Sequence, residues 1–127
     1  MLNRLIDLKK RREKRLRQRM SEGNKHSEEL LIKEGKLKES LTEFRKTWQE
    51  TVDNSTGVMT FAEYEDVSRK LKFFLEQDRI ILEKIKASVY ERQRWESEKL
   101  TLQNDINRCC AQQEKLKFVI EDLDNDH

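Results

Sequence analysis

The side chains of this chain that could take part in chemistry are two adjacent cysteines, two histidines, many carboxylates and a dense run of basic residues. Cys109 and Cys110 are neighbours, and a disulfide between adjacent cysteines is strained, so we expect both thiols to stay reduced. A metal or redox site here would need further ligands, and the histidines, His26 and His127, do not lie near this pair in the sequence. We therefore expect no metal site and no bound cofactor.

Residue patterns typical of enzymes are missing from the sequence. It has no glycine-rich phosphate loop, no HExxH, no CxxC and no nucleophile elbow of the form GxSxG. Carboxylates are abundant, but on a solvated helix face they ordinarily pair with Lys or Arg four residues away. We expect that the protein is not an enzyme.

The basic side chains gather at the N-terminus. Residues 1–20 hold nine Lys or Arg and two acids, a net charge of +7, whereas residues 118–127 hold four acids and no base. The run at residues 9–15 permits three interpretations: a nucleic-acid site, a solvated helix face, or a docking site for an acidic protein surface. It contains no aromatic residue for base stacking, and the whole chain carries only +2, so we do not expect nucleic acid as the partner.

Composition favours long helices over a compact core. Among 127 residues there is no Pro, 3 are Gly, 41% are charged and 35% are hydrophobic. So few apolar residues fill a narrow seam between helices better than a round core. No stretch approaches the ~18 apolar residues that a membrane span needs, and no apolar signal-peptide segment follows the charged N-terminus. We expect no membrane insertion, and a protein that stays where it is made.

A heptad rhythm runs through the first half of the chain and predicts a helix near residues 3–52. Its stripe consists of Leu2, Ile6, Lys9, Glu13, Leu16, Met20, Gly23, Ser27, Leu30, Glu34, Leu37, Leu41, Phe44 and Trp48. Gly23 and Gly35 each lower helix propensity by about 1 kcal/mol relative to Ala, yet we expect the helix to continue through both.

A turn is predicted at residues 53–60, and Thr60 and Glu63 then form a capping-box pattern that starts a second helix near 61–124. One of its two heptad series is Val67, Phe74, Ile81, Ser88, Trp95, Leu102, Cys109, Leu116 and Leu123. The other is Tyr64, Leu71, Asp78, Ile85, Arg92, Lys99, Ile106, Gln113 and Ile120. Between residues 73 and 89 further apolar residues widen the stripe, and they either pack on the first helix or meet a partner.

The sequence therefore predicts an all-α fold: an elongated, antiparallel two-helix coiled-coil hairpin over residues 1–127, with the second helix longer than the first. Folding at the turn would pair residue i with about residue 113 − i, so that Leu30 faces Leu82 and about 15 C-terminal residues overhang. Because the chain's own second helix fills the seam, we expect a monomer.

Two segments resemble a known family. The opening Met1-Leu-Asn-Arg-Leu-Ile-Asp-Leu-Lys-Lys-Arg-Arg-Glu-Lys-Arg-Leu-Arg resembles the start of type III secretion stalk proteins of the YscO/SctO family, the injectisome relatives of flagellar FliJ. The pattern Tyr64-x-x-Val67-x-x-x-Leu71-x-x-Phe74-Leu75-x-x-x-Arg79-x-x-Leu82 resembles the segment that opens the second helix in that family.

The resemblance implies a non-enzymatic central stalk in the bacterial cytoplasm, peripheral at the cytoplasmic face of the secretion apparatus. Its terminal end would enter and stimulate the hexameric secretion ATPase, and it would contact the cytosolic ring of the export gate and, in some members, secretion chaperones. The implied ATPase-binding residues are Leu2, Arg4, Lys9, Arg11, Arg12, Arg15, Phe118 and Val119. The implied gate-binding residues are Tyr64, Val67, Leu71, Phe74 and Asp78.

The chain departs from the family pattern at two of these positions, with Val67 where an aromatic residue is usual and Phe74 where a small one is usual. The heptads also place Tyr64, Val67, Leu71 and Phe74 in the seam, so packing is the competing interpretation for the gate residues. The alternative to a secretion stalk is a coiled-coil scaffold or tether of another complex, which would self-associate through the extra stripe at 73–89.

Overall fold

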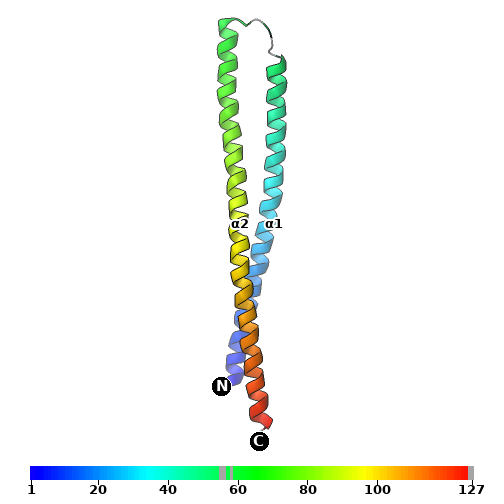
Figure 1. Ribbon diagram of the computed structural model, residues 1–127, viewed down its shortest axis with the longest axis vertical. Coiled ribbons are helices and arrows are strands. Elements are labelled where there is room, and N and C mark those ends of the chain that lie inside the picture. Colours follow the sequence, from blue (N-terminus) through cyan, green and yellow to red (C-terminus); the bar gives the residue numbers. More distant parts are fainter. Residues whose placement is uncertain (55–56, 58, 126–127) are drawn as a thin grey trace. The chain divides into compact units, whose positions relative to one another are not determined.

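A computed structural model describes residues 1–54, 57 and 59–125, and over this part of the chain the fold is all-α. Helix α1 spans Leu2–Asn54 and helix α2 spans Phe61–Asn125, with 53 and 65 residues. Figure 1 shows the two helices side by side and antiparallel, which confirms the predicted two-helix hairpin with a longer second helix. Over their described lengths, neither helix holds a segment that is long and apolar enough to cross a membrane.

Helix α2 begins with the predicted capping box, at the end of the connection between the two helices. The Glu63 backbone N–H donates to Thr60 Oγ1 at 3.2 Å, and the Thr60 N–H donates to Glu63 Oε2 at 3.2 Å. Both contacts satisfy backbone groups that lack a partner at a helix start. Gly57 in the connection has a φ of 149°, which glycine adopts readily. Residues 55, 56 and 58 of the expected turn, and residues 126 and 127, lie outside the described residues.

Contacts divide the chain into two compact units, each built from parts of both helices. Unit 1 contains Met1–Glu28 and Gln93–His127, and unit 2 contains Glu29–Arg92. Every residue of the heptad stripe on α1 is buried or half-buried. On α2 the two heptad series are buried or half-buried from Phe74 to Ile120, whereas Tyr64, Leu71 and Leu123 are exposed. The heptads therefore identify the seam correctly except near the two ends of α2.

The pairing register differs from the predicted one. In unit 1 the Cys109 thiol donates to the Lys9 carbonyl at 3.0 Å, and in unit 2 the Ser88 hydroxyl donates to the Leu30 carbonyl at 3.2 Å. Residue i thus faces about residue 118 − i in each unit, and the expected contact of Leu30 with Leu82 is wrong.

The shift is visible at the start of α2, whose first turn extends beyond the end of α1 (Figure 1). Phe61 and Tyr64 in this turn are 77% and 63% exposed, since α1 has no residues left to cover them. The same shift shortens the expected C-terminal overhang, and Ile120 is still half-buried.

A charged cluster sits inside the seam of unit 2. Glu34 is only 4% exposed, and its carboxylate accepts a hydrogen bond from Lys38 Nζ at 3.0 Å and one from Arg92 Nε at 2.9 Å. The hydrogen bond from Lys38, followed by that from Arg92, lowers the pKa of Glu34 below its usual 4.5. A buried charge is tolerated only when it is paired in this way.

Candidate functional site

The N-terminal part of α1 presents a basic surface in unit 1. Arg4, Arg11, Arg12 and Arg15 are exposed, and Lys9 is half-buried. Residues 1–20 contain nine basic side chains. Within the described residues only one of them, Arg17, forms an ion pair, with its Nε 3.7 Å from Glu13 Oε2. The other basic side chains of this segment form no ion pair with any described residue, so this surface attracts negatively charged partners over a long range.

Exposed apolar side chains accompany these charges. Phe118 and Val119, implied as ATPase contacts, are 71% and 44% exposed, whereas Leu2 is half-buried in the seam. Sequence reasoning missed Leu5 and Leu8, which are 40% and 52% exposed and directly precede the seam residues Ile6 and Lys9. Charge and exposed apolar surface together are suited to protein binding.

A small groove of about 170 Å³ crosses from α1 to α2 within this basic surface. Its lining includes three cations and one carboxylate, so it carries an excess of positive charge and can accept a carboxylate from a partner. It is lined by Lys9, Arg12, Asp105, Arg108, Cys109 and Gln112. Arg108 was not singled out from the sequence, because only the correct register brings it next to Arg12.

The two thiols are held by hydrogen bonds to α1. Cys109 is buried against the Lys9 carbonyl, and Cys110 donates to Glu13 Oε1 at 2.7 Å. The hydrogen bond to Glu13 raises the pKa of the Cys110 thiol, because it stabilises the protonated form. A raised pKa disfavours the thiolate, so this thiol is not activated as a nucleophile. Within the described residues, no group of three or more His, Cys, Asp or Glu side chains could hold a metal ion.

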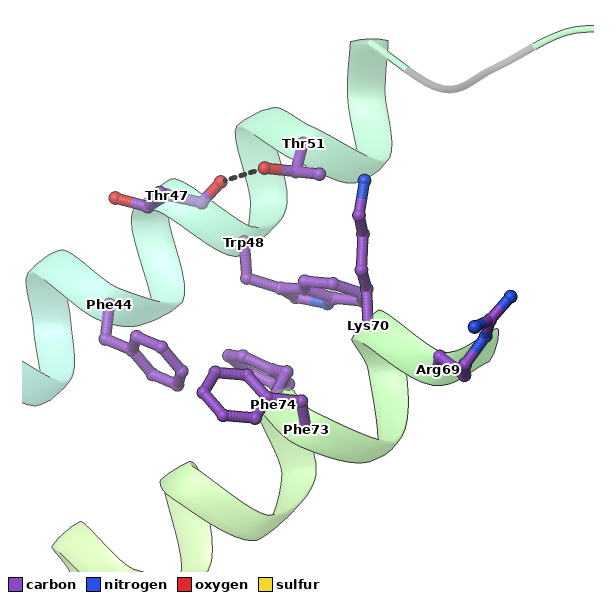
Figure 2. Close-up of a pocket in the computed structure, with 8 residues that line it drawn as sticks. All are labelled: Phe44, Thr47, Trp48, Thr51, Arg69, Lys70, Phe73 and Phe74. Atoms are coloured by element: carbon purple, nitrogen blue, oxygen red, sulfur yellow. Dashed lines mark hydrogen bonds between the residues drawn. The ribbon is translucent and has the colours of Figure 1, made fainter. Parts of the chain in front are cut away.

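An aromatic cluster joins the helices in unit 2. The ring of Phe74 stacks on Phe44 with centroids 5.0 Å apart and on Trp48 with centroids 4.9 Å apart. The interplanar angles are 18° and 14°, so the rings are nearly parallel. Figure 2 shows these rings filling the space between α1 and α2. Such pairs stabilise packing beyond the area they bury.

The cluster forms the floor of an open aromatic groove of about 460 Å³. Its other lining residues are Thr47, Thr51, Arg69, Lys70 and Phe73. Phe73 is 64% exposed, and Figure 2 shows Lys70 extending beside Trp48 while Arg69 points away from the rings. An apolar floor with a cationic rim fits a peptide whose apolar side chain lies near a carboxylate.

The structure divides the five implied gate residues into two groups. Phe74 belongs to the aromatic stack, Val67 is half-buried, and Asp78 accepts hydrogen bonds from Arg45 at 2.7 and 3.0 Å. The first of these contacts lowers the pKa of Asp78, which is therefore a paired carboxylate. Tyr64 and Leu71 are 63% and 41% exposed, so these two are free to meet a partner.

A comparison with protein-family models, with curated proteins and with solved structures found no match to this chain.

Proposed function

We propose that this chain is a non-enzymatic stalk of a bacterial type III secretion system, acting at the cytoplasmic face of the apparatus. Unit 1 binds and stimulates the hexameric secretion ATPase, and unit 2 contacts the cytosolic ring of the export gate. The observation that carries the proposal is the basic surface of unit 1, on which Arg4, Arg11, Arg12 and Arg15 are exposed and form no ion pair with any described residue. The identity of the partners comes from the resemblance of the sequence to the YscO/SctO family.

The basic surface suits such a contact physically. Its charges attract an acidic surface of the ATPase ring over a distance that the salt concentration determines. This attraction does not require a precise fit between the two surfaces. Leu8 and Phe118 add apolar area at short range, since 52% and 71% of these side chains are exposed. The groove between Arg12 and Arg108 receives one carboxylate, which gives the encounter a defined orientation.

The test is ATP hydrolysis by the cognate secretion ATPase with and without this protein. A variant with charge reversal at Lys9, Arg11, Arg12 and Arg15 should bind the ATPase weakly and fail to stimulate it. The matched control reverses four exposed lysines outside this surface: Lys33, Lys36, Lys46 and Lys84. Stimulation by the native chain and the control, but not by the basic-surface variant, supports the proposal. No stimulation and no co-sedimentation with the native chain contradict it.

The gate contact is proposed at Tyr64 and Leu71 and, on the other side of the seam, at Phe73 in the aromatic groove. Phe73→Ala and Tyr64→Ala should each weaken binding to the purified cytosolic domain of the export gate. Tyr90→Ala serves as the matched control, because Tyr90 is 68% exposed in the same unit but does not line the groove. If all three variants bind the gate domain as tightly as the native chain does, the gate contact does not lie at these residues.

The alternative is a scaffold or tether of another complex. It is favoured by apolar residues beside the seam, since Phe73 and Leu75 are 64% and 56% exposed. Sedimentation distinguishes the two functions, because a stable dimer without a detectable monomer fits the scaffold and a monomer fits the stalk.

A further inference from the structure

Unit 2 carries a second apolar surface that the ATPase contact does not use and that continues along α2 beyond Leu71, on the opposite side of the seam from Phe73. On α2, Leu75, Leu82 and Val89 follow one another at seven-residue spacing, so they lie in one line along the helix. Leu75 is 56% exposed, and Leu82 and Val89 are half-buried. Leu75 follows the seam residue Phe74, whereas Phe73 of the aromatic groove precedes it, which places the two surfaces on opposite flanks of the seam.

An ion pair shows which line of α1 borders this flank. Asp78 lies three residues after Leu75 and four before Leu82, so all three share one side of α2. Asp78 binds Arg45 of α1 at 2.7 Å. Arg45 is in turn spaced by whole heptads from Lys38 and Leu31, so these also border the flank, and Leu31 is 54% exposed. We call Leu31, Leu75, Leu82 and Val89 the Leu75 stripe.

Basic residues line the outer edge of the Leu75 stripe. Lys72, Arg79 and Lys86 each precede a stripe residue of α2 by three positions and recur at seven-residue spacing. Arg79 is neutralised by Glu76 and Glu83 on its own helix. Lys72 and Lys86 are exposed and form no ion pair with any described residue. In coiled coils, charges beside an apolar line select the partner helix by opposite charge.

We propose that the Leu75 stripe is the docking surface for an amphipathic helix of another protein, whose apolar face is bordered by Glu or Asp. The incoming helix covers the stripe and completes a local three-helix coiled coil, while its carboxylates meet Lys72 and Lys86. A second copy of this chain fits less well, because an isologous contact over the stripe places lysine-bordered edges near each other and like charges repel.

The test uses the full-length chain and two labelled synthetic helices of about four heptads with Leu at the apolar positions. One peptide carries Glu at the flanking positions and the other carries Lys. The Glu peptide should bind the native chain at least about tenfold more tightly than the Lys peptide, and less tightly as salt rises. The double variant Leu31→Ser, Leu75→Ser should weaken the Glu peptide by a similar factor.

Charge reversal supplies the sharper experiment. The variant Lys72→Glu, Lys86→Glu should weaken the Glu peptide and strengthen the Lys peptide, an exchange that loss of folding cannot produce. Matched controls are Phe73→Ser on the opposite flank and Lys84→Glu, both of which should leave peptide binding unchanged. The variant reversed at Arg11, Arg12 and Arg15 should also bind normally, which excludes capture of the Glu peptide by the basic surface of unit 1.

Three results would overturn the proposal. The first is equal affinity for the two peptides, and the second is binding that survives the stripe variants but fails in the unit 1 variant. The third is a dimer of the native chain that dissociates on Leu75→Ser, which would assign the stripe to a second copy.

Discussion

The indole ring of Trp95 lies directly over the backbone of Gly23, so that a Cβ atom at residue 23 would fall among the ring atoms. The indole Nε1–H donates to the side-chain oxygen of Asn24 at 3.3 Å. The close approach explains why a glycine stands inside α1 at a cost of about 1 kcal/mol in helix propensity. The absence of a side chain at Gly23 makes room for the ring of Trp95, and this contact holds the two helices of unit 1 in register.

Replacing this glycine should therefore destabilise the protein although alanine favours helix. We expect Gly23→Ala to lower the free energy of unfolding by about 1–3 kcal/mol, because the ring must move from its site. Urea denaturation followed by circular dichroism measures the change. Gly35→Ala is the matched control, since apart from its chain neighbours and the backbone of its own helix nothing lies within 4 Å of its Cβ position, and it should stabilise by up to about 1 kcal/mol. Equal stabilisation by both variants would contradict the packing of Trp95 on Gly23.

Two adjacent phenylalanines should respond differently to truncation. Phe74→Ala removes a ring stacked on both Phe44 and Trp48, and we expect a loss of about 2–4 kcal/mol in the free energy of unfolding. Phe73→Ala removes a mostly exposed ring, and its effect on stability should stay within about 0.5 kcal/mol. Thermal unfolding of the two variants gives the comparison, and similar losses would mean that Phe73 is packed.

Stability should fall in acid partly through Glu34. Its pKa is lowered in the folded state, so its stabilising contribution is complete above the unfolded value near 4.5 and is lost as pH falls through the lower folded value. Glu13 and Asp78 are shifted in the same direction, so a difference measurement is needed. The gap in unfolding free energy between the native chain and Glu34→Gln should shrink as pH drops below 4.5. A gap independent of pH would show that Glu34 is unpaired.

Thiol alkylation should report the contact between Cys110 and Glu13. At about pH 8, iodoacetamide should modify Cys110 more slowly than a free cysteine, because its raised pKa leaves less thiolate. Glu13→Gln should accelerate the reaction, while Cys109, which is buried, reacts more slowly in both proteins. Denatured protein, in which both thiols react freely, is the control. An unchanged rate in Glu13→Gln would exclude the hydrogen bond as the cause.

Heptad spacing was sufficient to predict which side of each helix faces the other. Even polar members such as Glu13 and Ser88 lie in the seam, because a coiled coil keeps every position of the line at the interface whatever its side chain. The capping box at Thr60 was predictable for a different reason, since it depends only on residues three positions apart.

The register was not predictable from the same pattern, because the heptads show which side of each helix faces the other but not how far one helix is shifted along the other. It depends on particular pairs such as Trp95 with Gly23 and Arg45 with Asp78, and on how far α2 begins beyond α1. Arg108 in the basic groove was missed for this reason. Tyr64 fits the heptads but is exposed, since local spacing does not reveal where the partner helix ends. Leu71 also fits the heptads and is 41% exposed, although its place in the register still lies opposite α1.

The pairing of Glu34 with Arg92, 58 positions further along the chain, also bears on synthesis. The ribosome completes α1 well before Arg92 emerges, so the nascent first helix carries on its apolar line a carboxylate whose one partner is Lys38 of its own helix. Two nascent first helices on neighbouring ribosomes would bring such carboxylates together, which disfavours their association. We expect the charge at Glu34 to keep α1 available until its own second helix has been made.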